Sequence, residues 1–142
     1  MTIATILAGK GADVVTITAD TSVQDALNVL AVRRIGAVPV MEGDRVVGIF
    51  SERDVIQCLA ERGAEGLGRA VAEAMTAPVI SVGRDEAALG ALSLMTRRRV
   101  RHLPVVEGDR LIGFVSIGDL VKYRIDKIEA DAEAMRSYIQ AV

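Results

Sequence analysis

Apolar and polar positions alternate along the chain in an order that predicts a series of short elements. Residues 14–17, Val-Val-Thr-Ile, form a β-branched run that predicts a strand. Thr21 and Gln24 have the spacing of a capping box, which predicts the start of a helix. Apolar residues then recur at helical spacing and give that helix one apolar face: Val23, Ala26, Leu27 and Leu30.

Two further apolar runs, over residues 38–41 and 46–50, predict a β-hairpin. They are separated by a Gly43-Asp44 pair, which can adopt the positive φ angles of a tight turn. Pro39 cannot donate to a sheet ladder, so we expect its strand at an edge or a bulge. A second helix begins at Ser51 or the residue after it. The predicted order is strand, helix, strand, strand, helix.

The same pattern returns 65 residues later. Residues 35–56 align without a gap on residues 100–121, and nine of these 22 positions are identical. The second copy therefore predicts a strand over 79–82, a helix over 86–98, strands over 102–106 and 110–115, and a helix from about residue 117. Each copy has roughly 50 residues, so we expect the two to share a core.

The repeat also predicts how the chain is divided. Residues 62–68 are rich in glycine and read as a linker before a short helix over residues 70–75. We assign residues 1–70 to the first repeat with its N-terminal segment and linker. Residues 71–127 form the second repeat, and residues 117–142 form a long C-terminal helix.

This last helix is longer than the repeat requires. Its apolar residues are spaced alternately by four and three positions, as in a heptad seam: Val121, Ile125, Ile128, Ala132, Met135, Ile139 and Val142. Such a seam needs a partner. Either the helix folds back across its own module or it is shared between the subunits of a homodimer.

Composition excludes several function classes. The 17 basic and 19 acidic residues give a net charge of -2, and aromatic residues make up 3%, so we expect no nucleic-acid partner. The basic cluster of Arg97, Arg98, Arg99 and Arg101 complements the C-terminal dipole of a helix if it is only a solvated helix end. The chain shows neither a membrane span nor the features of a signal peptide, and we expect a cytoplasmic protein.

The single cysteine and single histidine argue against catalysis. Cys58 cannot form an internal disulfide, and with His102 alone it cannot build a zinc finger or a multi-histidine metal centre. Cys58 lies in a helical pattern among apolar residues, where a buried structural role is expected. We identify no acid–base pair or nucleophile, and so we predict that the protein is not an enzyme.

Each copy closes with Gly-x-x-Ser-x-x-Asp, ending at Ser51 and Asp54 or at Ser116 and Asp119. Ser-x-x-Asp before an apolar helix is a capping box, with the carboxylate favoured at the positive helix end. The two motifs, the Pro-Val pairs and the Gly-Asp hairpins, all in register, resemble a tandem pair of CBS (cystathionine-β-synthase) domains, a Bateman module. The resemblance implies an α/β fold of the α+β type, with two β-α-β-β-α repeats related by a pseudo-twofold axis and their sheets packed together.

The resemblance also implies a ligand. In similar proteins this motif binds the adenosine part of AMP, ADP, ATP, NAD(H) or S-adenosylmethionine, and we place AMP first. Ser51, Asp54, Ser116 and Asp119 would bind ribose, and Arg101 and His102 would bind phosphate at the Ser51–Asp54 cleft only. The other cleft would be faced by the backbone of Gly36 and Ala37. The implied wall of the two clefts consists of Thr16, Ile17, Gly36, Ala37, Val38, Pro39, Gly48, Ile49, Ile80, Ser81, Leu103, Pro104, Gly113 and Phe114.

The expected role is that of a homodimeric regulatory sensor with an effector protein that the sequence does not identify. His102 opens an aliphatic strand, so it either contacts the ligand or packs in the sheet. The alternative to a sensor is a structural interaction module without a physiological nucleotide.

Overall fold

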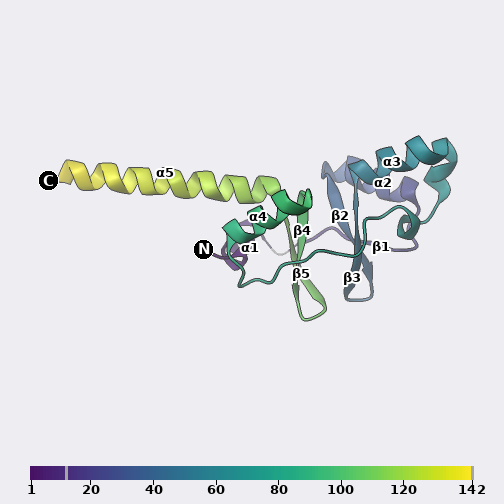
Figure 1. Ribbon diagram of the computed structural model, residues 1–142, viewed down its shortest axis with the longest axis horizontal. Coiled ribbons are helices and arrows are strands. Elements are labelled where there is room, and N and C mark those ends of the chain that lie inside the picture. Colours follow the sequence, from purple (N-terminus) through teal and green to yellow (C-terminus); the bar gives the residue numbers. More distant parts are fainter. Residues whose placement is uncertain (12, 142) are drawn as a thin grey trace.

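The computed structural model of the protein describes residues 1–11 and 13–141. Helices and strands follow the order that the repeat predicts, except that, among these residues, one helix is added before the first strand and the second repeat has no strand before α4 (Figure 1). The elements are α1 (Ile3–Lys10), β1 (Ile17–Thr18), α2 (Val23–Arg33), β2 (Ala37–Glu42), β3 (Arg45–Ser51), α3 (Glu52–Arg62), the 3-10 helices η1 (Gly63–Gly68) and η2 (Val71–Glu73), α4 (Ala88–Arg98), β4 (His102–Glu107), β5 (Arg110–Ser116) and α5 (Ile117–Ala141).

The two predicted hairpins are confirmed. β2 pairs with β3 and β4 pairs with β5, both antiparallel, and each turn has a glycine at positive φ: 60° at Gly43 and 63° at Gly108. Asp44 does not share the positive φ that the sequence suggested for the pair. Pro39 lies on β2 just beyond the two residues that β1 covers, beside a register shift at Val40, so its missing N–H leaves no ladder bond broken.

The first strand of each repeat is shorter than predicted. Only Ile17 and Thr18 pair with β2, in parallel, instead of the run over 14–17. In the second repeat the expected strand over 79–82 reduces to one parallel bridge between Val82 and Val105. Apolar β-branched residues favour extended backbone, but in the parallel register Thr16 and Ser81 come opposite Pro39 and Pro104, which have no N–H to donate to a ladder.

The start of α2 also differs from prediction by one residue. Ser22, not Thr21, is the N-cap, and its hydroxyl accepts from the Asp25 N–H at 3.0 Å. The apolar face is confirmed, since Val23, Ala26 and Leu30 are buried. The cap moved because serine followed by aspartate three residues later satisfies the same helix-end donors as the predicted pair.

The two repeats meet about a pseudo-twofold axis, as the fold class predicted. β3 and β5 are antiparallel neighbours in a sheet of order β1-β2-β3-β5-β4, and the pair that joins them is Arg45 and Arg110, which are equivalent in the two repeats. A second equivalence lies at the helix starts. The Glu52 N–H donates to the Gly36 carbonyl, and the Ile117 N–H donates to the Arg101 carbonyl.

Two hydrophobic clusters make up the core, one for each repeat. The first gathers residues of α2, β2, β3, α3 and η2, including Phe50 and the buried Cys58. The thiol of Cys58 donates to the Gly66 carbonyl at 3.5 Å, which confirms its structural role. The second cluster contains Ile3 and Ile6 of α1 together with α4, β4, β5 and the start of α5. The N-terminal segment therefore packs with the second repeat, although it precedes the first in the sequence.

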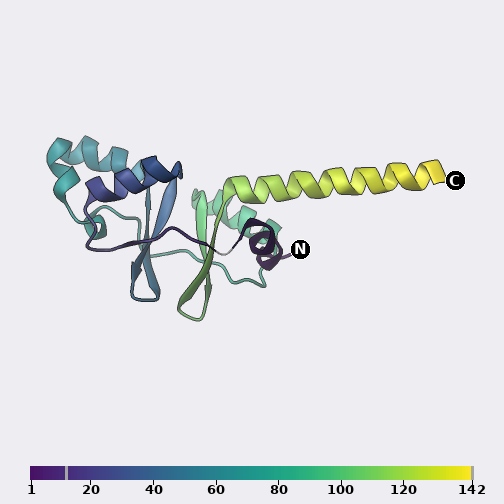
Figure 2. The same cartoon turned by 180° about the vertical axis from the view of Figure 1, so that it is seen from behind.

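Helix α5 extends away from both repeats (Figures 1 and 2). Leu120 near its start is buried, whereas the seam residues from Val121 to Ile139 are exposed. The helix does not fold back across its own module, so that interpretation of the seam is wrong. Val142, the last position of the predicted seam, lies outside the described residues. Among those residues no helix is long and apolar enough to cross a membrane.

Candidate functional site

A cavity of about 650 Å³ lies between the two repeats. Its wall combines the start of α3, the end of α4, the start of β4 and the segment that leads into the second repeat. Its residues are Gly36, Ile49, Ser51, Glu52, Arg53, Ile56, Thr76, Pro78, Val79, Ile80, Arg98, Arg99, Val100, Arg101 and His102. The structure thus brings Ser51, Arg101 and His102 together, as the cross-repeat assignment predicted.

Asp54 is not among the residues that line this cavity. One carboxylate oxygen accepts from the Ser51 N–H at 2.8 Å and from the Ser51 hydroxyl at 3.1 Å, and the other accepts from the Thr76 hydroxyl at 3.0 Å. Asp54 is only 7% exposed, and among the described residues it is the one charged residue that is buried. Thr76 lines the cavity, so a ribose bound there would compete with the Thr76 hydroxyl for this carboxylate.

Cations gather on the opposite wall. Arg98 ends α4, Arg99 follows it in the left-handed region at φ 55°, and Arg101 precedes β4. All three side chains are exposed and line the cavity, whereas Arg97 does not line it. The arginines therefore complement the C-terminal dipole of the helix and also offer an anion several guanidinium groups.

His102 is half-buried at the first position of β4. Its ring stacks on Phe114, with 5.5 Å between ring centroids and 12° between planes. Burial lowers the pKa of His102, the charges of Lys10 and Arg101 lower it further, and Asp119 and Glu52 oppose the shift. Ligand contact and packing are thus both available to this side chain.

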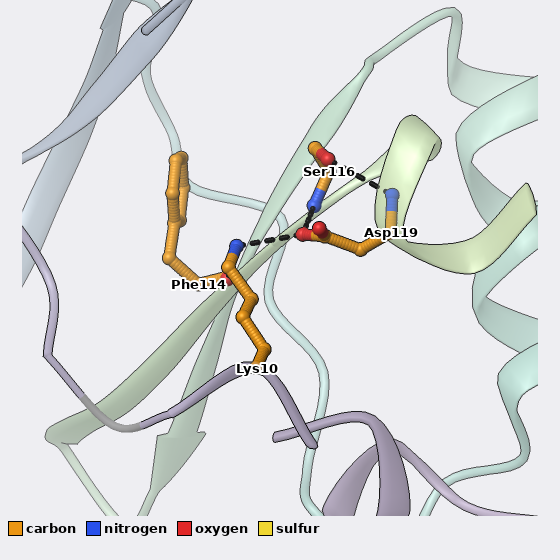
Figure 3. A network of polar contacts seen from close by, with 4 residues as sticks. All are labelled: Lys10, Phe114, Ser116 and Asp119. Carbon is orange, nitrogen blue, oxygen red and sulfur yellow. Dashed lines mark hydrogen bonds and ion pairs between the residues drawn. The ribbon is translucent and has the colours of Figure 1, made fainter. Parts of the chain in front are cut away.

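The second motif faces a lysine from α1 (Figure 3). Ser116 and Asp119 form a reciprocal capping box, with the Ser116 N–H donating to Asp119 at 2.8 Å and the Asp119 N–H donating to the Ser116 hydroxyl at 3.1 Å. The Lys10 ammonium donates to the same carboxylate at 2.6 Å and to the Phe114 carbonyl at 2.7 Å. Burial raises the pKa of Asp119, but the hydrogen bonds from Lys10 and Ser116 outweigh it and hold the pKa below its usual range.

Comparison with known families gives this geometry a context. The family model described as "CBS domain" matches residues 11–61 and again residues 71–126. The chain belongs to the CBS domain family. The two matches coincide with the two repeats, and the structure holds them as one CBS pair.

Relatives of this CBS pair agree with that assignment. The CBS domain-containing protein CBSX3, mitochondrial, of Arabidopsis thaliana is 32% identical over 128 residues. The match covers 87% of this chain and 62% of that relative. A crystal structure of a CBS-domain containing protein from Agrobacterium tumefaciens is 40% identical, with a TM-score of 0.84 over 87% of this chain and 99% of the other. The crystal structure of CBSX2 in complex with AMP is 26% identical, with a TM-score of 0.71 over 80% and 89% of the two chains.

The wall residues implied by the CBS resemblance fall into different places. Gly36, Ile49 and Ile80 line the cavity. The side chains of Val38, Pro39, Leu103 and Pro104 are fully buried, Ile17 and Ala37 are buried, and Thr16 and Ser81 are exposed. At the fully buried positions only backbone groups remain available to a ligand.

Two glycines of the motifs are explained by packing. A Cβ on Gly48 would lie 2.4 Å from the sulfur of Met75, and a Cβ on Gly113 would lie 2.6 Å from a methyl group of Leu7. The segment before each first strand therefore packs directly on the motif glycine of the other repeat. We expected these glycines to admit a ligand, but protein side chains cover them.

Sequence reasoning missed the residues that these segments contribute. Thr76 and Lys10 bond to the two motif aspartates, and neither was among the predicted site residues. The available signal was the pattern of Ile3, Ile6 and Leu7, whose helical spacing indicates α1 and places Lys10 one turn after Ile6.

Proposed function

We propose that this CBS pair is a non-enzymatic sensor that binds an adenine nucleotide, with AMP first among the candidates, in the cavity between the repeats. The observation that carries the proposal is the combination of Ser51 with Arg98, Arg99, Arg101 and His102 around one cavity of about 650 Å³. That volume lies within the range of small-molecule sites, about 300–1,000 Å³.

Each part of a nucleotide finds suitable chemistry there. Ile49, Val79 and Ile80 offer apolar surface to adenine, and Ser51 with Asp54 offers oxygen acceptors to the ribose hydroxyls once Thr76 gives way. Arg101 and His102 face the same space and offer donors to a phosphate. The solved complex of CBSX2 with AMP supports AMP as the first ligand to test.

We further propose that α5 joins two copies of the chain as a homodimer. Its apolar seam is exposed along the described length, including Ile125, Ile128, Met135 and Ile139 at 50–64%. A seam with alternating spacing of four and three residues fits a second helix of the same kind. The same surface favours the second candidate function, a structural interaction module without a nucleotide. The effector protein of a sensor and its cytoplasmic location remain predictions.

Calorimetric titration of the full chain with AMP, ADP, ATP, NAD, NADH and S-adenosylmethionine tests the proposed function. A sensor shows saturable binding of at least one nucleotide, and none is consumed over the titration. An interaction module shows no binding in this series, and consumption of the nucleotide would reveal an enzyme.

The first prediction concerns the arginine wall. Arg101→Ala should weaken AMP binding at this cavity by tenfold or more, because a hydrogen bond to a charged group contributes about 1.5–3 kcal/mol. Adenosine binding should change much less. Arg97→Ala is the matched control, since Arg97 belongs to the same cluster but does not line the cavity. Equal losses of AMP affinity in both variants would reject the assignment of phosphate to this wall.

A further inference from the structure

The two motif aspartates occupy equivalent positions but have different partners. Asp54 accepts from the neutral hydroxyl of Thr76, whereas Asp119 accepts from the charged ammonium of Lys10 (Figure 3). In the register of the repeat, Lys10 and Gly11 are equivalent to Met75 and Thr76. Gly11 has no side chain that could take the place of the Thr76 hydroxyl, and Lys10 fills that role with a cation.

The ion pair is held in place but accessible. The ammonium is fixed by two acceptors, the Asp119 carboxylate at 2.6 Å and the Phe114 carbonyl at 2.7 Å. The side chains of Lys10 and Asp119 are 37% and 26% exposed. Ion pairs with this much exposure contribute little to stability. A ligand can therefore replace the ammonium at Asp119 at modest cost.

A ribose bound by Asp119 would leave the ammonium beside the ligand. Its long side chain can turn away from Asp119 while α1 stays packed on the second core through Ile3 and Ile6. From the first repeat, the sequence assigns only the backbone of Gly36 and Ala37 to this cleft, but in the structure Gly36 lines the other cavity and Ala37 is buried. A phosphate on the ligand would thus lie near the Lys10 ammonium and pair with it. A ligand without an anionic group would displace the ammonium from Asp119 and give it no new partner.

We propose that Lys10 determines the specificity of the second cleft: it is the exchangeable counterion of Asp119 and selects ligands that carry a phosphate. The proposal rests on the proposed function, because it assumes that the second motif also binds a ribose. In the first cleft several arginines share this selection, whereas in the second it depends on one residue. A nucleoside, or a ligand with a positive charge such as S-adenosylmethionine, is disfavoured there.

The test compares AMP and adenosine by calorimetry on the full chain. Binding that disappears in Asp119→Asn is assigned to the second cleft. We expect this cleft to prefer AMP over adenosine by at least tenfold. Lys10→Met keeps the length of the side chain without its charge and should reduce that preference by at least tenfold, with weaker AMP and tighter adenosine binding. Lys10→Arg should keep most of the preference.

Several results separate this inference from the proposed function. An unchanged preference in Lys10→Met, with binding at the second cleft intact, overturns the role of Lys10. Binding at the second cleft in Lys10→Met but not in the natural chain also overturns it, because Lys10 would then only block the cleft. Binding confined to the first cleft in every variant overturns the inference and leaves the proposed function standing. No binding of AMP, adenosine or the other nucleotides at either cleft removes the proposed function itself.

Discussion

His102 is surrounded by charges from both motifs. Lys10 and Asp119 lie on the side of the second cleft, whereas Arg101 and Glu52 lie on the side of the cavity. Burial and the two cations lower the pKa of the imidazole more than the two carboxylates raise it. The folded protein therefore favours neutral His102 at neutral pH.

The pH dependence of stability should report this shift. A lowered pKa means that the unfolded chain takes up the proton more readily. The stabilising contribution is therefore complete above the unfolded pKa of about 6.5 and is lost as the pH falls toward the folded pKa. His102→Gln cannot take up this proton, so it should lose less stability than the natural chain between pH 7.5 and 5.5. Urea unfolding at several pH values measures the difference.

The comparison of the two proteins cancels the other titrating groups. The loss of ring stacking on Phe114 should lower the stability of His102→Gln by a similar amount at every pH. Parallel stability curves for the two proteins would mean that His102 is protonated equally in the folded and unfolded chains.

Helix α5 was predicted from its apolar seam, and the structure confirms a long helix with that seam exposed. A helix of 25 residues is about 37 Å long, and Leu120 is its buried residue. Between the seam positions, Arg136 pairs with Glu133 at 2.8 Å. Such pairs stabilise an isolated helix only slightly, so a long helix in water needs a partner for its apolar face.

Truncation after Arg124 should weaken the proposed homodimer and leave nucleotide binding intact. The change removes most of the seam and none of the residues that line the cavity. Sedimentation equilibrium measures the dimer, and calorimetry with AMP measures binding. A full-length chain that is monomeric at micromolar concentration would reject the seam as a dimer contact. A truncated chain that keeps its dimer but loses AMP would instead place α5 in the binding site.

Elements with local signals were predictable, and elements that depend on distant partners were not. The turns at Gly43 and Gly108 and the start of α3 at Glu52 were fixed by neighbouring residues. The length of β1 depended on which residues of β2 it meets, Pro39 among them, and no local pattern of Val14 and Val15 reveals that. Helix α1 was overlooked although Ile6 is equivalent to Val71 in the repeat, because the surface that its apolar residues pack on lies in the second repeat.

At the scale of the whole molecule the two repeats are crossed. Segment 3–10 precedes the first repeat and packs in the core of the second, whereas Val71 precedes the second repeat and is buried in the core of the first. The site inherits this crossing, since Thr76 and Lys10 each bond to the aspartate of the repeat that their segment packs on. Sequence reasoning found the motifs themselves but not these two partners, because only the packing brings them together.

The crossed packing predicts which elements lose local stability when a core residue is substituted. Ile3→Ala should lower stability by about 2–5 kcal/mol, because the fully buried side chain leaves a cavity. Hydrogen exchange should increase mainly in α4, β4 and β5, which share its core. Val23→Ala, the control in the other core, should act mainly on α2, β2 and β3. An increase in the first repeat on Ile3→Ala, equal to that in the second, would show that the two cores do not open separately.

The crossed packing of α1 has a consequence during synthesis. Ile3 and Ile6 leave the ribosome before both repeats, but their partners in α4, β5 and the start of α5 follow roughly 100 residues later. At about 5–20 residues per second, this helix waits on the order of 5–20 s for the surface that covers it. A helix made before both repeats is thus covered only after most of the second repeat has been made. A nascent chain that stops before α5 has no Asp119 to receive Lys10, so the second cleft forms only as synthesis of the CBS pair nears completion.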